Sequence, residues 1–104
     1  VQIRLMDPSA VMHAGLVRHV REVAEERKIA HQVAVRKSGG TDARAIQLHA
    51  SGVPTVVLGV PARYVHTHNS VIHIGDYLSA LELVLELVQS LDAATVDRLC
   101  AFEA

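Results

Sequence analysis

The feature that most constrains the fold is the alternation of short β-branched runs with longer segments of helical periodicity. Apolar runs typical of strands occupy residues 1–6, 31–35, 55–60 and 70–74, and "TVVLGV" (55–60) has the composition of a central strand. Between and after these runs, apolar residues at helical spacing predict helices over residues 10–28, 42–51, 76–91 and 93–102. Elements that alternate in this way favour an α/β fold, in which helices flank a layered sheet.

Local signals indicate where several of these helices begin and end. The Asp-Pro-Ser segment at 7–9 combines a capping side chain with a proline suited to a first turn, so we expect Asp7 to cap the first helix. Gly52 is placed to close the second helix in a left-handed conformation, and Gly75 and Asp76 to begin the third. Leucines and valines leave the third helix only a narrow polar stripe, which predicts burial on most sides.

Length and composition narrow the classes of protein that this chain can represent. The 104 residues fit one domain, and a net charge of −1 with interspersed signs lacks the basic surface of a nucleic-acid-binding protein. No apolar run approaches the roughly 18 residues of a membrane span, so we expect neither nucleic acid nor membrane as a partner. The single cysteine, Cys100, can form no internal disulfide, which indicates a reducing, cytoplasmic environment. The chain opens directly in a strand pattern without Met, so we expect it to be part of a longer domain.

A glycine-rich turn joins the second predicted strand to the second predicted helix. Gly39 and Gly40 let the backbone turn sharply, and we expect at least one of them to have a positive φ. The helix that follows points free N–H groups at this turn, which favours an anion or a carboxylate there. A second interpretation stays open, in which Thr41 or Asp42 only caps the helix.

Three of the seven histidines fall between residues 66 and 73, just beyond a strand-like run that ends at a proline. In an extended segment His66 and His68 would point to the same side, and imidazole is a ligand suited to zinc or cobalt. Two surface histidines in a loop are the alternative, because a metal site needs further ligands. The histidines within or beside regular elements are interpreted as structural: His13, His19, His31 and His49.

Two stretches taken together resemble a known enzyme family. "GGTDARAIQLHASGVPTVVLGVPARYVHTHNSVIHIGDY" (39–77) is similar to the C-terminal catalytic region of the glutamyl and deblocking aminopeptidases. These are metal-dependent enzymes that assemble into tetrahedral particles, and some of them have been labelled endoglucanases. The combination of Gly-Gly-Thr-Asp with a later Pro-x-Arg-Tyr-x-His carries the resemblance, and "IRLMDPSAVMH" and "AEERKIAHQV" extend it over nearly the whole chain. It implies that residues 1–104 are the C-terminal portion of a zinc-aminopeptidase-like catalytic domain.

The resemblance implies a two-metal aminopeptidase that hydrolyses N-terminal residues from peptides. A pair of zinc or cobalt ions would polarise the scissile carbonyl and hold the attacking hydroxide, and a glutamate would act as general base. The histidine of Arg-Tyr-x-His maps to His66, the expected metal ligand, whereas the family does not use the position of His68. The residues expected to bind or border the substrate are Gly39, Gly40, Thr41, Asp42, Arg63 and Tyr64.

The departures from the family pattern qualify what this chain does alone. The other metal ligands and the general base have no match in it, and Arg44 stands where the family has a small residue. We therefore expect the 104-residue chain by itself to fold, to bind no metal, to be catalytically inactive, and to associate as a homo-oligomer, with residues 1–6 as a candidate edge strand.

The sequence leaves two alternatives to the aminopeptidase to compare. One is a truncated, non-catalytic module for assembly or binding that keeps the family fold. The other is a glucanase, which the sequence disfavours because it has no convincing pair of carboxylates and only 3% aromatic residues for stacking on sugars.

Overall fold

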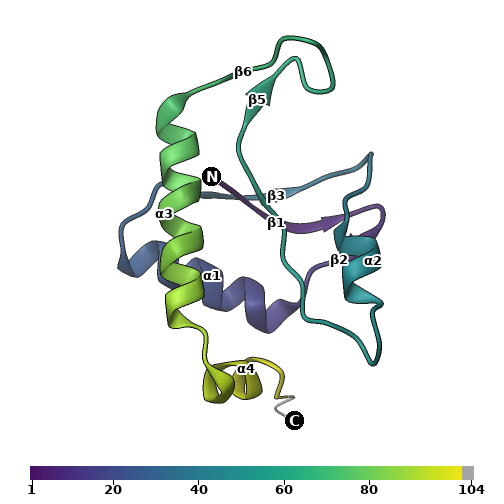
Figure 1. Ribbon diagram of the computed structural model, residues 1–104, viewed down its shortest axis with the longest axis vertical. Coiled ribbons are helices and arrows are strands. Elements are labelled where there is room, and N and C mark those ends of the chain that lie inside the picture. Colours follow the sequence, from purple (N-terminus) through teal and green to yellow (C-terminus); the bar gives the residue numbers. More distant parts are fainter. Residues whose placement is uncertain (102–104) are drawn as a thin grey trace.

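The computed structural model describes residues 1–101, and they form the expected α/β arrangement (Figure 1). A four-stranded sheet lies against helices α1 and α3, and a separate two-stranded hairpin projects beyond the end of α3. In chain order the elements are β1 (Gln2–Asp7), β2 (Ala10–Val11), α1 (Ala14–Glu26), β3 (Gln32–Val35), α2 (Ala43–Gln47), β4 (Leu58–Gly59), β5 (Ala62–Arg63), β6 (Val71–Ile72), α3 (Ile74–Ser90) and α4 (Ala93–Leu99).

Strand β1 is the centre of the sheet, so the expectation that residues 1–6 form a free edge is wrong. On one side β1 pairs in parallel with β3, with Ile3 opposite Val33. On its other side β1 pairs antiparallel with β4 near its start and with β2 near its end. The Arg4 amide also donates to the Val57 carbonyl at 3.0 Å. Both edges of β1 are therefore occupied, and neither can recruit another chain.

The segment 7–9 forms a hairpin turn, and the expectation that it starts the first helix is wrong. The chain folds back on β1, so that Val11 pairs with Met6 and the helix begins only at Ala14. His13 caps α1 instead: its Nδ1 accepts a hydrogen bond of 3.1 Å from the Leu16 amide. Asp7 accepts from the Ser9 amide at 2.8 Å, the local turn that aspartate favours in competition with helix capping.

Several other boundaries lie inside the expected ranges. Helix α2 ends at Gln47, and Gly52, although its φ is +105°, lies beyond the helix end that it was expected to close. Regular strand pairing covers only Leu58–Gly59 of residues 55–60 and Val71–Ile72 of residues 70–74. Helix α4 ends at Leu99, and its expected last residue, Phe102, lies outside the described residues.

Helix α3 begins at Ile74, and the preceding residue, His73, caps it. The His73 Nδ1 accepts a hydrogen bond of 3.0 Å from the Gly75 amide. Gly75 and Asp76 thus lie inside the helix and do not cap it. Burial on most sides is also wrong, because the buried side chains of α3 are Leu83 and Leu87. Large apolar side chains on the rest of the helix are exposed: Ile74, Tyr77, Leu78, Leu81, Val84, Leu85 and Val88.

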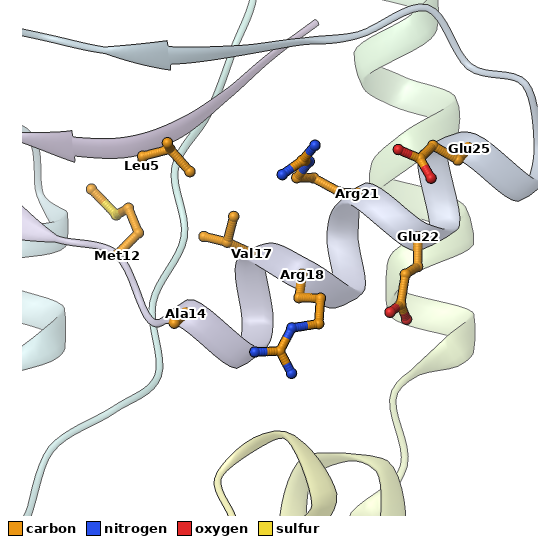
Figure 2. A pocket seen from close by; sticks show the side chains of 8 residues that line it. All are labelled: Leu5, Met12, Ala14, Val17, Arg18, Arg21, Glu22 and Glu25. Atoms are coloured by element: carbon orange, nitrogen blue, oxygen red, sulfur yellow. The ribbon is translucent and has the colours of Figure 1, made fainter. Parts of the chain in front are cut away.

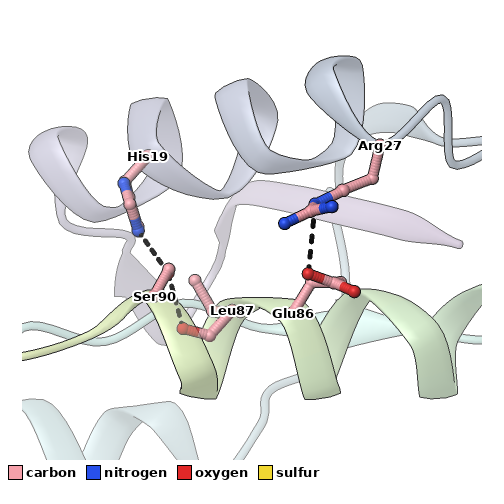
Figure 3. A network of polar contacts seen from close by, with 5 residues as sticks. All are labelled: His19, Arg27, Glu86, Leu87 and Ser90. Carbon is pink, nitrogen blue, oxygen red and sulfur yellow. Dashed lines mark hydrogen bonds and ion pairs between the residues drawn. The ribbon is translucent and has the colours of Figure 1, made fainter.

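The core forms where α1 packs between β1 and α3. Ile3 of β1, Val20 of α1 and Leu83 of α3 are the largest fully buried side chains. Polar contacts join the two helices at the rim (Figure 3): His19 Nε2 lies 2.8 Å from Ser90 Oγ, and Arg27 Nε lies 3.1 Å from Glu86 Oε2. The ion pair is partly exposed and adds little, so burial of apolar surface holds the helices together.

Across residues 1–101, no helix combines the length and apolar character needed to cross a membrane.

We expect Gly15→Ala to destabilise the fold, although alanine normally favours a helix. A Cβ at residue 15 would collide with the Leu99 backbone carbonyl, because α4 packs directly on the first turn of α1. The cost should be about 1–3 kcal/mol, as for other overpacking substitutions. Urea unfolding would measure it. Gly75→Ala is the matched control, since Gly75 follows the capping His73 of α3 as Gly15 follows His13, but its Cβ would meet only the His73 ring. Equal stability of the two variants would contradict the prediction.

Candidate functional site

The Gly-Gly-Thr-Asp loop (residues 39–42) connects β3 to α2 at the carboxyl end of the parallel strand pair. The Arg36 amide donates to the Met6 carbonyl at 3.0 Å, which keeps the ends of β3 and β1 together. Gly39 has a φ of +79° with open space where a Cβ would lie, so the expectation of a positive φ in this pair is confirmed. A Cβ on Gly40 would lie 3.3 Å from the Ser9 side chain. The loop backbone therefore runs close against the 7–9 turn.

Neither Thr41 nor Asp42 caps α2 with its side chain, so the helix-capping interpretation of these residues is wrong. Asp42 already has helical backbone angles (φ −62°, ψ −15°) and makes no side-chain cap bond, whereas a capping residue normally has extended ones. The Thr41 hydroxyl instead donates to Asp7 Oδ2 at 2.9 Å. The polar side chain of Thr41 is thus directed across the loop to β1.

Asp7 is the functional-site neighbour that sequence reasoning missed. Its carboxylate is only 2% exposed and accepts from the Ser9 amide, from the Ser9 hydroxyl at 2.5 Å and from Thr41. The Ser9 hydroxyl is the largest cause that holds the Asp7 pKa below its ordinary value of 3.8, and burial opposes it. The charged carboxylate therefore stabilises the fold at pH values above 3.8, and this stabilisation is lost as the pH falls through the lowered pKa. The Asp-x-Ser spacing, typical of an aspartate turn, was the available signal.

Ser9 joins the turn to the loop by two further contacts. Its hydroxyl oxygen accepts from the Thr41 amide at 3.3 Å, and its carbonyl accepts from Gln47 Nε2 of α2 at 3.3 Å. Beside these contacts lies an open hollow of about 590 Å³, lined by Pro8, Ser9, Gly39, Gly40 and Arg44. The hollow combines loop backbone with one guanidinium, a lining that can accept a polar or acidic group.

The other predicted residues lie on the hairpin formed by β5 and β6, where Arg63 pairs with Val71. Tyr64 and His66 both have left-handed backbone angles, with φ of +59° and +63°. The Thr67 hydroxyl donates to the Tyr64 carbonyl at 2.5 Å and stabilises this tight turn. Such angles are uncommon for residues other than glycine, and they cluster where a turn presents side chains for function.

The hairpin turn changes the relation between His66 and His68. The segment is a series of turns and bends, so the extended geometry that would place both imidazoles on one side is wrong. Within residues 1–101, neither ring nitrogen of His66 makes a hydrogen bond, and the side chain is exposed. The His66 imidazole is therefore free to act as a ligand.

The structure does not bring the loop and the hairpin into one cavity. Asp42 lines a hollow with Thr55 and Val57, whereas Arg63 lines another with His73 and Asp76. Figure 1 shows α2 beside one end of the sheet and the β5–β6 hairpin away from it, above the sheet near the start of α3. In the described part of the chain, no three His, Cys, Asp or Glu side chains could hold a metal ion together. Among the described residues, His66 alone is placed as a candidate metal ligand, so further ligands would have to come from other segments.

A further hollow of about 450 Å³ lies between β1 and α1, away from every predicted site residue (Figure 2). Its floor is apolar, from Leu5, Met12 and Val17, and Arg18, Arg21, Glu22 and Glu25 stand at its rim. The charged side chains lie along α1 and do not converge on one point (Figure 2). This hollow therefore has no arrangement suited to chemistry.

The roles of the other histidines agree with a structural interpretation in three cases. His13 caps α1, His19 contacts Ser90, and His31 Nδ1 lies 2.8 Å from the Ile29 carbonyl. Each imidazole is thus occupied by a contact that supports a neighbouring element.

Comparisons with known proteins cover both candidate regions. The M42 glutamyl aminopeptidase family matches residues 1–83. The glutamyl aminopeptidase of Lactococcus lactis subsp. cremoris is 36% identical over 94 residues, which are 90% of this chain and 26% of that protein. The TET aminopeptidase from the marine sediment archaeon Thaumarchaeota archaeon SCGC AB-539-E09 superposes with a TM-score of 0.92 at 33% identity, covering 94% of this chain and 28% of that one.

A second solved structure, PhTET1-12s, a dodecamer in its asymmetric unit, has a TM-score of 0.77 at 34% identity and covers 86% of this chain and 26% of that one. The chain spans about a quarter of the length of these relatives. The α/β fold and both candidate regions fall within the matched part. The chain belongs to the M42 glutamyl aminopeptidase family.

Proposed function

We propose that this chain forms part of the catalytic domain of a metal-dependent aminopeptidase, which hydrolyses N-terminal residues from peptides. The observation that carries the proposal is the family match over residues 1–83, because it includes both the Gly-Gly-Thr-Asp loop and the Arg-Tyr-x-His hairpin turn. Since the chain spans about a quarter of its relatives, the activity belongs to the complete protein that contains it.

His66 is the proposed metal ligand of this chain. Its imidazole is exposed on a tight turn with both nitrogens free of hydrogen bonds in residues 1–101, so it can meet an ion held by other segments. Two divalent ions, zinc or cobalt, would supply polarisation of the scissile carbonyl when bound. Arg63, at the end of β5, and Tyr64, on the same turn as His66, are the proposed substrate contacts beside that ion.

The Gly-Gly-Thr-Asp loop is the proposed substrate-binding element of this chain. The absence of a side chain at Gly39 leaves open space over the backbone, so a peptide can approach the loop closely. Arg44 adds a positive charge to the hollow beside Gly39 and Gly40.

We expect His66→Ala in the complete protein to lower metal content and aminopeptidase activity together, the activity by at least about a hundredfold, because a lost ligand opens the site. Metal per subunit can be measured by elemental analysis, and activity with an aminoacyl-anilide and added zinc or cobalt. His68→Ala is the matched control from the same turn and should change both far less. Normal metal occupancy with full activity in the His66 variant would refute the assignment.

We also propose that the complete protein is a homo-oligomer. The exposed apolar side chains of α3 recur at helical spacing and form one stripe, from Ile74 to Val88, that a soluble chain rarely leaves uncovered. A second copy is the proposed occupant, because PhTET1-12s is a dodecamer.

Light scattering coupled to size-exclusion chromatography should give the complete protein a mass of several subunits. Leu85→Lys should lower that mass without loss of helical circular dichroism, because it places a charge in the stripe. Glu82→Lys, an exposed position on the same helix outside the stripe, is the control and should leave the mass unchanged. A monomeric wild-type protein, or an unchanged mass for Leu85→Lys, would contradict this assembly.

A further inference from the structure

We propose that Asp7 is a positioning residue for the Gly-Gly-Thr-Asp loop: through Ser9 and Thr41 it holds the loop backbone in the conformation that receives the peptide. The inference rests on the proposed aminopeptidase function. Asp7 itself lies beneath the loop, almost fully buried, and does not face the substrate.

The first step is that both carboxylate oxygens of Asp7 accept hydrogen bonds. Oδ1 accepts from the amide and the hydroxyl of Ser9, and Oδ2 accepts from the Thr41 hydroxyl. A buried carboxylate without partners would be strongly unfavourable, and hydrogen bonds to a charged acceptor are stronger than neutral ones. The Ser9 bonds are local, within one turn, but the Thr41 bond joins residues 34 positions apart. That bond therefore joins the loop directly to the last residue of β1, and the bond from the Thr41 amide to the Ser9 hydroxyl supports it.

The second step is that the loop has few other restraints. Residues 36–40 and Asp42 are exposed, and Thr41 is the partly buried member of the segment. Arg36 is held by the Met6 carbonyl at the end of β3. From Lys37 to Gly40, no hydrogen bond is made to any other residue in the part of the chain that the structure describes. Thr41 is thus the next fixed point after Arg36.

The third step concerns the two glycines between these fixed points. Gly39 and Gly40 have wide conformational freedom, so their native backbone is maintained only if the flanking residues are fixed. Ser9 lies close to Gly40, because its side chain is 3.3 Å from where a Gly40 Cβ would stand. Loss of the Asp7 bonds would release Ser9 and Thr41 together. The expected consequence is weaker substrate binding without loss of metal.

The test uses Asp7→Asn and Thr41→Val in the complete protein, both close to isosteric. Each should raise KM for an aminoacyl-anilide about tenfold, with little change in kcat and unchanged metal content, because one charge-assisted bond is lost. The double variant should resemble the single ones, since both remove the same bond. Thr41→Ser, which keeps the hydroxyl, should raise KM less than Thr41→Val.

Asp92→Asn is the matched control. Asp92 also accepts a short hydrogen bond, 2.7 Å from the Thr95 amide, and its pKa is likewise lowered, chiefly by that bond, but it caps α4 far from the loop. It should leave KM unchanged. An unchanged KM for Asp7→Asn, or an equal rise for Asp92→Asn, would overturn the inference.

Amide hydrogen exchange provides a readout that does not need activity. In Asp7→Asn, the loop amide of Thr41, which donates to Ser9 Oγ in the wild type, should exchange about tenfold faster, while amides of α1 and α3 keep their protection. If the wild-type complete protein has no aminopeptidase activity but Asp7→Asn still speeds loop exchange, the positioning role stands and the proposed function is refuted. Unchanged loop exchange would refute the positioning role, whatever the activity.

Discussion

The pairing of β1 on both of its edges is the constraint on which the rest of the structure depends. The parallel register with β3 brings the carboxyl ends of these two strands to the same place. Because β1 ends in the 7–9 turn and β3 ends in the Gly-Gly-Thr-Asp loop, the register alone places the turn beside the loop. The antiparallel pairing with β4 then directs the chain back toward the start of β1 and on to the hairpin. Both candidate regions therefore leave the same sheet.

Asp7 shows how this central strand reaches the site. The strand buries the carboxylate at its end, and burial requires that hydrogen-bond donors meet it. A local turn supplies Ser9, and the strand register supplies Thr41 from the neighbouring loop. Burial of this charge would be unfavourable without these donors. With them, the carboxylate holds one residue of a glycine-containing loop in place.

The chain presents its candidate groups outward and does not combine them in an enclosed centre. Arg63 of the hairpin and the Gly-Gly-Thr-Asp loop line different hollows, and α3 leaves an apolar stripe exposed. The relatives, of which this chain spans about a quarter, have the additional segments that could face such groups. Under the proposed function, such segments would account for two features of residues 1–101: an imidazole that makes no hydrogen bond there and a helix with apolar residues on its outer side.

Periodicity and motifs in the sequence were sufficient for the α/β class, for the order of the main elements, and for the family. They also predicted the left-handed conformation in the Gly39 and Gly40 pair, since glycines are placed where the backbone itself requires them. The individual elements and the glycine conformation are local features, because a short window of residues determines each of them, whereas the family rests on motifs spread along the chain.

Tertiary structure decided the features that depend on distant partners. Asp7 could cap a helix or close a turn, and its hydrogen bond from Thr41, 34 positions away, favours the turn. Thr41 could cap α2 or bond to Asp7, and the parallel register of β1 with β3 selected Asp7. Whether residues 1–6 lie at the edge or the centre of the sheet, and how much of α3 is buried, depends likewise on segments far away in the chain. Hydrogen bonds and burial between residues tens of positions apart leave no periodic signal in the sequence, so only the folded chain reveals them.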